Sequence, residues 1–135
     1  MKKTSILLIF SLYLALQSSA VKMSPVSAGV NESIAAAIKT GNSSELAKYF
    51  NNTVEIQIPA NEGTFSKSQA EMIVKEFFLK NPPVSYTSNQ QGSSNGGAQF
   101  MIGTYKSGKL VFHVYILIKP IAGKMLIQQL HFENE

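Results

Sequence analysis

The sequence predicts an α+β domain in which helices cover one face of an antiparallel sheet. Apolar residues recur at helical spacing through much of the first half of the chain. After Pro83 they alternate with polar residues, as in strands that bury one face. Because helices come before most of the strands, this order favours an α+β architecture over alternating β-α-β units with a parallel sheet.

The first twenty residues have the composition of a secretory signal. Two lysines precede an apolar run from Ile6 to Leu16, and Ser18 and Ala20 supply the small residues of a cleavage site. The run is shorter than the ~20 apolar residues that a membrane span needs, and the absence of cysteine excludes a lipid-anchored lipoprotein. We expect cleavage after Ala20 and a bacterial protein exported to the periplasm or the medium. An uncleaved N-terminal anchor is the alternative.

Residues 30–135 are predicted to form a single domain, preceded by a flexible lead-in at residues 21–29. After cleavage about 115 residues would remain, enough for one hydrophobic core with little to spare. Since the chain has no cysteine, a fold in an oxidising compartment would depend on packing without disulfide bonds.

Two short helices are predicted before the first strand. The first begins at Val30 and ends at Gly41, whose position predicts a left-handed cap. The second follows Asn42, which with Glu45 resembles a capping box, and runs through Phe50. Alternation over residues 53–58 then predicts a half-buried strand, and residues 63–65 a second short strand.

A long third helix is predicted over residues 67–80. Ser66 and Gln69 form the strongest capping signal in the sequence, and residues 81–83, Asn-Pro-Pro, end the helix. Glu71 and Glu76 each precede a lysine by four residues, the favoured order for an ion pair on the solvent side of a helix.

Four strands are predicted after Pro83, near residues 84–91, 98–106, 109–119 and 124–133. A two-residue turn at Ser107-Gly108 predicts a hairpin. This turn would place Ile102 opposite His113 and Phe100 opposite Tyr115. An odd-length loop after Lys119 would place His113 opposite His131, Tyr115 opposite Gln129 and Val111 opposite Glu133, whereas an even loop would break that register.

The predicted sheet has two apolar faces. The helix-covered core face would carry Met101, Leu110, Phe112, Val114, Ile116, Leu126, Leu130 and Phe132. The other face would carry Phe100, Ile102, Val111, His113, Tyr115, Leu117, Ile127, Gln129 and His131. A water-facing side of a sheet is normally polar. We therefore expect something to cover the second face: a second copy in a homodimer, or a small-molecule or peptide ligand.

Six residues of the second face are the candidate ligand or interface residues: Phe100, Ile102, His113, Tyr115, Gln129 and His131. Composition argues against nucleic acid as the partner. The chain has no arginine, which supplies the planar fork that binds phosphates and guanine edges. Loss of the two signal lysines would also lower the net charge from +4 to about +2. We expect no cofactor and no membrane association after cleavage.

Weak candidates for chemistry remain. His113, His131 and Glu133 could together form a three-ligand zinc site, although paired histidines on neighbouring strands more often fill a semi-polar surface. Glu55 or His113 beside a tyrosine could transfer protons in an isomerase or hydrolase. A non-catalytic binding module is the favoured interpretation, and this small enzyme is the alternative.

Seven stretches along the chain carry a family resemblance: residues 38–42, 46–50, 66–71, 77–83, 91–94, 102–103 and 114–117. They resemble an exported bacterial family of unknown function, the domain-of-unknown-function family numbered 4783, within the nuclear-transport-factor-2-like (cystatin-like) superfamily. The resemblance implies a cone-shaped domain, often paired through its sheet, with a pocket between helices and sheet. Superfamily enzymes use an Asp or Asp/His acid-base set, which cannot be carried over to a chain without aspartate.

Overall fold

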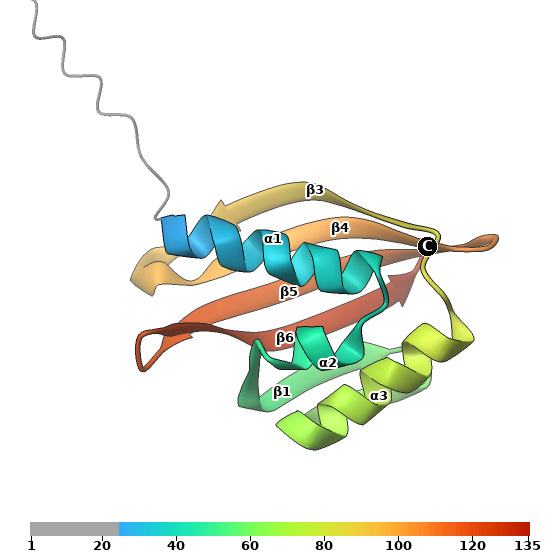
Figure 1. The fold of residues 1–135 in the computed structure, drawn as a ribbon, viewed down its shortest axis with the longest axis horizontal. Coiled ribbons are helices and arrows are strands. Elements are labelled where there is room, and N and C mark those ends of the chain that lie inside the picture. The colour runs from blue at the N-terminus through green and yellow to red at the C-terminus, as the bar shows by residue number, and fades with distance from the viewer. Residues whose placement is uncertain (1–24) are drawn as a thin grey trace, which may run out of the picture.

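The computed structural model describes residues 25–135, and the predicted secretory signal lies outside this part of the chain. Three helices lie on one face of a six-stranded sheet (Figure 1), which confirms the predicted α+β class. The helices are α1 (Pro25–Lys39), α2 (Ser43–Ala47) and α3 (Lys67–Lys80). The strands are β1 (Phe50–Ile58), β2 (Asn61–Ser66), β3 (Ser85–Ser93), β4 (Gln99–Ser107), β5 (Leu110–Ile121) and β6 (Lys124–Asn134).

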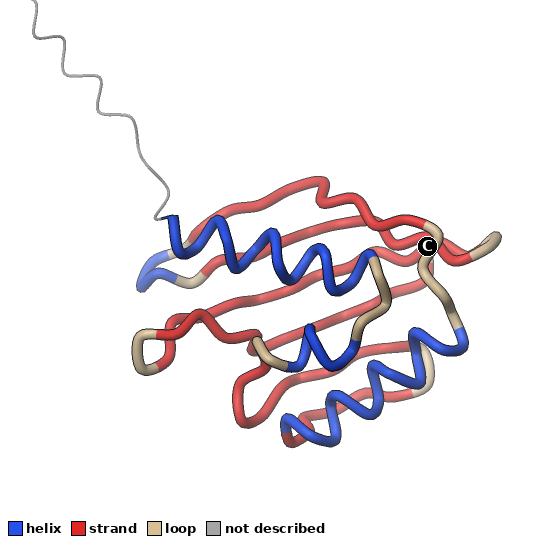
Figure 2. Tube along the Cα trace, in the orientation of Figure 1, coloured by secondary structure: helices blue, strands red, loops and turns tan. Residues whose placement is uncertain are grey.

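The strand order across the sheet is β2-β1-β6-β5-β4-β3. Four of the neighbouring pairs are antiparallel, and β1 pairs with β6 in parallel. The early hairpin β1–β2 is therefore joined to the later meander β3–β6 only through β6. Figure 2 shows the three helices crossing in front of this continuous sheet. No helix among residues 25–135 is long and apolar enough to span a membrane.

Helix α1 is longer than the sequence predicts. It begins at Pro25, a residue favoured in the first turn because its missing N–H would have no helical partner there. Residues 25–29, predicted as part of a flexible lead-in, are therefore helical, and α1 with 15 residues matches α3 with 14. The helix ends at Lys39, and Gly41 two residues later has φ +64°, the left-handed conformation predicted for the cap. The N–H of Asn42 donates to the Ala37 carbonyl at 2.8 Å and closes the cap.

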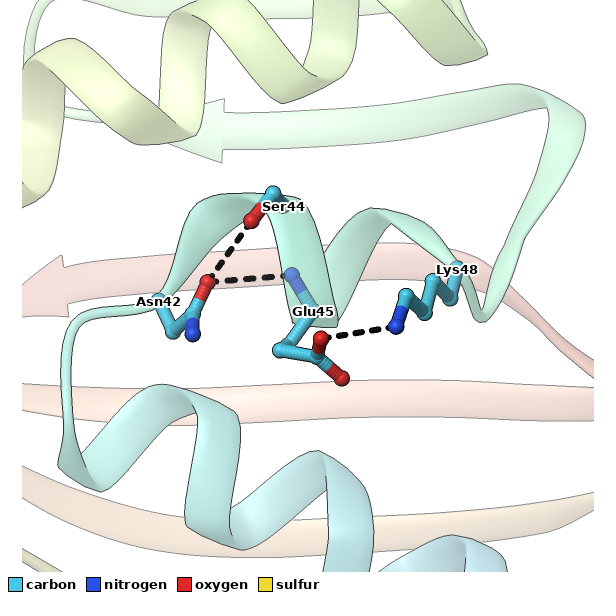
Figure 3. A network of polar contacts seen from close by, with 4 residues as sticks. All are labelled: Asn42, Ser44, Glu45 and Lys48. Carbon is cyan, nitrogen blue, oxygen red and sulfur yellow. Dashed lines mark hydrogen bonds and ion pairs between the residues drawn. The ribbon is translucent and has the colours of Figure 1, made fainter.

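The short helix α2 is capped by Asn42 (Figure 3). The Asn42 side-chain oxygen accepts hydrogen bonds from the Glu45 backbone N–H at 3.1 Å and from the Ser44 hydroxyl at 2.9 Å. The Glu45 carboxylate does not complete a capping box. It contacts Lys48 Nζ at 2.7 Å instead.

The second helix ends before the predicted residue. Helix α2 stops at Ala47, and Phe50, predicted as its last residue, is the first residue of β1. The side chain of Phe50 is 1% exposed, and its Cα pairs with that of Ile127 on β6. Phe50 is therefore a strand residue because it pairs with a strand more than seventy residues later in the sequence.

Helix α3 has the predicted bounds, Lys67 to Lys80. Ser66 Oγ accepts from the Gln69 backbone N–H at 3.3 Å, and Gln69 Oε1 accepts from the Ser66 N–H at 3.4 Å. These two contacts form the predicted capping box. At the other end, the Asn81 backbone N–H donates to the Phe77 carbonyl at 2.8 Å.

The hairpin between β4 and β5 turns one residue later than predicted. Ser107 pairs with Leu110, so the turn residues are Gly108 and Lys109, with Gly108 at φ +58°. The partner of each β4 residue moves by two positions, which leaves the faces of both strands unchanged. The pairs are Ile102–Tyr115, Phe100–Leu117 and Thr104–His113, in place of the predicted Ile102–His113 and Phe100–Tyr115.

The hairpin between β5 and β6 has an even loop where the prediction required an odd one. Its two turn residues are Ala122 and Gly123, with φ +49° and +80°. Side-chain alternation is restored by a bulge: Ile118 pairs with Ile127 and Leu117 with Gln129, so Gln128 is the extra residue. The predicted pairs are replaced by His113–Glu133, Tyr115–His131 and Leu117–Gln129.

The bulge also exchanges two residues between the faces. Ile127, predicted on the second face, is 0% exposed in the core, and Leu126, predicted in the core, is only half-buried. Leu110 is a second exception on the core face, since it is 51% exposed. The other predicted core residues of the sheet are buried: Met101, Phe112, Val114, Ile116, Leu130 and Phe132.

Two tyrosines in the core have raised pKa values. Burial raises the pKa of Tyr86 to about 12, and its buried hydroxyl has no hydrogen-bond partner among residues 25–135. Burial also raises the pKa of Tyr105, whose hydroxyl donates to the Asn81 carbonyl. Both residues are therefore neutral in the folded protein well above pH 10.

Tyr86→Phe is expected to leave stability at neutral pH unchanged or to raise it by about 1 kcal/mol, because it removes a buried, unpartnered hydroxyl. At alkaline pH the effect grows. A tyrosine with a raised folded-state pKa contributes stability that is complete below pH 10 and is lost as the pH rises through the folded-state pKa of about 12. The free energy of unfolding, measured with guanidinium at a series of pH values from 7 to 12, should therefore fall less steeply with pH for the variant than for the wild type. Equal slopes for the two proteins would contradict this account.

Candidate functional site

The face of the sheet opposite the helices, which we call the open face, has no helix over it within residues 25–135 (Figure 1). Its apolar side chains are half-buried through contact with their neighbours alone. They are Phe100 and Ile102 on β4, and Val111, Tyr115 and Leu117 on β5. The register places Ile102 beside Tyr115 and Phe100 beside Leu117, so these residues form one continuous apolar patch.

Phe100 also covers a glycine on the edge strand. A Cβ added at Gly92 would lie 2.4 Å from Phe100 Cζ, so the aromatic ring rests directly against the backbone of β3. Gly92 and Phe100 are paired across the two strands. Because Gly92 has no side chain, the Phe100 ring can lie over β3, and the apolar patch extends from β5 to the sheet edge.

A polar cluster borders this patch on the side of β1. Glu55 Oε1 lies 3.0 Å from His131 Nε2, and Gln129 Nε2 donates to Glu55 Oε2 at 3.2 Å. The Tyr115 ring lies against the His131 ring, with centroids 5.7 Å apart. The parallel β1–β6 pairing makes this cluster, because it puts Glu55 directly beside Gln129. The His131 side chain is 16% exposed and that of Glu55 45% exposed.

The structure brings together some of the predicted site residues and separates others. Tyr115, Gln129 and His131 form one group, and Glu55 joins them from β1. His113 is exposed and lies opposite Glu133, not opposite His131. Among residues 25–135 no three His, Cys, Asp or Glu side chains are grouped as a metal would need. The zinc site suggested by the sequence required His113 opposite His131, and that pair does not form.

A separate cavity of about 220 Å³ lies on the other side of the sheet, between the C-terminal half of α3 and the ends of β1, β5 and β6. Its apolar residues are Ile58, Pro59, Ala60, Ile73, Phe77, Leu110 and Phe112. Its polar residues are Asn61, Glu76, Lys80, Asn81 and Asn134. The family resemblance implies a pocket between helices and sheet, but sequence patterns do not indicate which residues line it, because Leu110 has the alternation of a core residue. Only the position where α3 ends leaves it uncovered.

The acid-base alternative requires Glu55 or His113 beside a tyrosine in a pocket. Glu55 does lie in one group with His131 and Tyr115, but that group is on the open face. Glu55 and His113 both lie on the open face, and neither lines the cavity beside α3. Tyr86 and Tyr105 are buried in the core, on the helix side of the sheet, whereas Glu55 and His113 lie on the open face. The arrangement as a whole offers surfaces for binding: an apolar patch with a polar border, and a small cavity with one acidic and one basic residue.

Comparisons with solved structures show the same fold. A DUF4783 family protein from Bacteroides uniformis is 28% identical, with a TM-score of 0.74 over 78% of this chain and 97% of that one. A DUF4783 family protein from Bacteroides ovatus is also 28% identical, with a TM-score of 0.72 over 76% and 93%. An NTF-2-like protein of unknown function from Silicibacter pomeroyi, 9% identical with a TM-score of 0.56 over 82% and 93%, shares the fold alone.

No curated protein matches the chain by sequence. The family model described as "Domain of unknown function (DUF4783)" matches residues 31–133, from the second turn of α1 almost to the end of β6. This match includes all of the open face and nearly all of the residues around the cavity. With its nuclear-transport-factor-2-like architecture, the chain belongs to the DUF4783 family of domains of unknown function.

Proposed function

We propose that the protein is an exported, non-catalytic binding module that acts through the open face of its sheet, and that a second copy covers this face. The observation that carries the proposal is the apolar patch of β4 and β5. Its side chains alternate with core residues on strands whose opposite face is already covered by helices. Sheets with one solvated face normally place polar residues there.

The layout of the open face supports a protein–protein contact. Phe100, Ile102, Tyr115 and Leu117 lie side by side on β4 and β5, and the cluster of Glu55, Gln129 and His131 lies beside them. An apolar centre with a polar border is the arrangement found in protein interfaces. In a two-fold symmetric pair the same patch would serve both copies, so the patch would need no different partner.

Export is supported by the first twenty residues, which have a basic start, an apolar run and a small-residue cleavage site. The described domain fits that route, since it has no cysteine to form incorrect disulfide bonds. The proposal therefore places the mature domain in the periplasm or the medium. Mass spectrometry of the protein recovered from the periplasm or the medium should give the mass of the chain without its first twenty residues.

Leu117→Lys is expected to weaken self-association at least about 100-fold, because it would place an unpaired charge in the apolar centre of each interface. Sedimentation equilibrium of the mature protein at micromolar concentration measures this change. The matched control is Leu79→Lys, the same substitution at a 71% exposed position on α3, on the helix side. A wild-type protein that stays monomeric, or equal losses in both variants, would contradict the proposal.

A further inference from the structure

We infer that the cavity beside α3 binds a small apolar α-amino acid, whose side chain fills the cavity while its charged backbone groups contact Glu76 and Lys80. The cavity lies on the helix side of the sheet and shares no residue with the apolar patch or polar cluster of the open face. The inference therefore stands independently of self-association.

The floor of the cavity is apolar and rigid. Ile58, Phe77 and Phe112 are 7%, 4% and 2% exposed, so their positions are set by the core behind them. Leu110 forms part of the wall and is 51% exposed, although it belongs to the core face of β5. An apolar group in the cavity would remove the exposed part of Leu110 from water. The floor thus favours an aliphatic or aromatic group.

One face of α3 supplies the other wall. Glu76 and Phe77 are three and four residues after Ile73, and four and three residues before Lys80, so all four lie along one side of the helix. Ile73 and Phe77 face the apolar floor, whereas Glu76 and Lys80 are exposed at the rim. The same helix therefore offers an apolar surface and two opposite charges to one bound molecule.

The two rim charges are not paired with each other. Glu76 precedes Lys80 by four residues, the order that favours an ion pair. Yet among residues 25–135 the ion pairs within 4 Å are Lys48–Glu45 and His131–Glu55. Of the described residues that line the cavity, Glu76 and Lys80 are the only ones with ionisable side chains. One carboxylate and one ammonium group that remain free can each bind the opposite charge of a zwitterion.

A ligand with a single charge fits this rim less well. A ligand with only a carboxylate would be attracted by Lys80 and repelled by Glu76. A ligand with only an amine would be attracted by Glu76 and repelled by Lys80. The side chains of Asn61 and Asn134 add uncommitted amide groups at the rim, since neither makes a side-chain hydrogen bond within residues 25–135. The rim therefore selects for a zwitterion with hydrogen-bonding capacity.

The volume limits the ligand to a small molecule. About 220 Å³ lies below the ~300–1,000 Å³ of sites for drug-sized ligands. It suits a molecule of about a dozen non-hydrogen atoms, the size of phenylalanine, with the ring against Phe77 and Phe112 in an edge or tilted contact. L-Phenylalanine is therefore the probe for this site.

The test is a titration of the isotope-labelled mature protein with L-phenylalanine, followed by amide chemical shifts. Saturable shifts confined to the second half of α3 and to residues 110–112 are expected. Glu76→Gln and Lys80→Met should each weaken binding by about twofold to fivefold, as expected for loss of one exposed charge contact. The matched controls Glu71→Gln and Lys75→Met carry the same changes on α3 away from the cavity and should bind as the wild type does.

Two further ligands separate the roles of the charges. 3-Phenylpropionate lacks the ammonium group and phenethylamine lacks the carboxylate, so both should bind more weakly than phenylalanine. Equal binding of either compound, or the absence of saturable shifts with phenylalanine, would overturn the inference. So would equal losses in the rim variants and their controls. Leu117→Lys, which tests self-association, should leave phenylalanine binding unchanged, so the two proposals can fail separately.

Discussion

Phe77→Ala is expected to lower the free energy of unfolding by about 3–5 kcal/mol, the range for a buried phenylalanine truncated in a core. Phe77 is 4% exposed and lies at the centre of the aromatic core. Its ring centroid is 4.6 Å from that of Phe132, 5.2 Å from Phe112 and 5.7 Å from Tyr105. Alanine would remove all of these contacts and join the resulting void to the cavity beside α3.

The size of this loss is large for such a domain, because small domains have total stabilities of about 5–15 kcal/mol. Guanidinium unfolding of the variant should show a much lower midpoint. Leu79→Ala is the matched control, since Leu79 lies on the same helix but is 71% exposed. Its effect should stay within about 0.5 kcal/mol, as for most surface substitutions. Comparable losses at the two positions would show that α3 does not pack as described.

Gly103→Ala is expected to cost about 3 kcal/mol, at the upper end of the range for overpacked sites. A Cβ at this position would lie 2.6 Å from Tyr86 Cε2 and 2.7 Å from the Thr87 carbonyl oxygen. Gly103 does not have a positive φ, so the cost comes from contact alone and not from backbone strain. The Tyr86 ring cannot simply rotate away, because it is buried beneath the helices.

The control for Gly103→Ala is Gly29→Ala. A Cβ at Gly29 would meet nothing within 4 Å, and the residue lies in helix α1. Alanine is a better helix former than glycine by roughly 0.5–1 kcal/mol, so this variant should be more stable than the wild type. Thermal and denaturant unfolding of the two variants should therefore shift in opposite directions. An unchanged midpoint for Gly103→Ala would refute the close approach of Tyr86.

The elements that the sequence predicts to the residue are those whose ends are set by short-range contacts. Helix α3 begins at a reciprocal hydrogen-bonded pair three residues apart and ends next to Asn81. Likewise, the cap at Gly41 depends only on carbonyls of the preceding turn. These contacts can be inferred from neighbouring residues because the chemistry lies within one turn of helix.

Two of the errors of prediction come from contacts between distant segments. Phe50 has no local reason to leave a helix, and its place in β1 depends on pairing with Ile127. The bulge at Gln128 likewise has no local signal, and it decides whether Leu126 or Ile127 enters the core. Register is a property of two strands together, so one strand's pattern gives the faces but not the partners.

The candidate sites divide in the same way. Alternation identified the open face correctly for Phe100, Ile102 and Tyr115, because it needs only the period of the strand. The contact of Glu55 with His131 could not be foreseen, since nothing local indicates that β1 runs parallel to β6. The cavity beside α3 depends on three elements that end near one another in space, which no single pattern shows.

The position of β6 in the strand order has a consequence for biosynthesis. It is the last of the described strands to leave the ribosome, yet it is the strand that joins β1 to β5. Until residues 124–134 are available, the β1–β2 hairpin is not joined to strands β3–β5. The complete six-stranded sheet can therefore form only after residues 124–134 have left the ribosome.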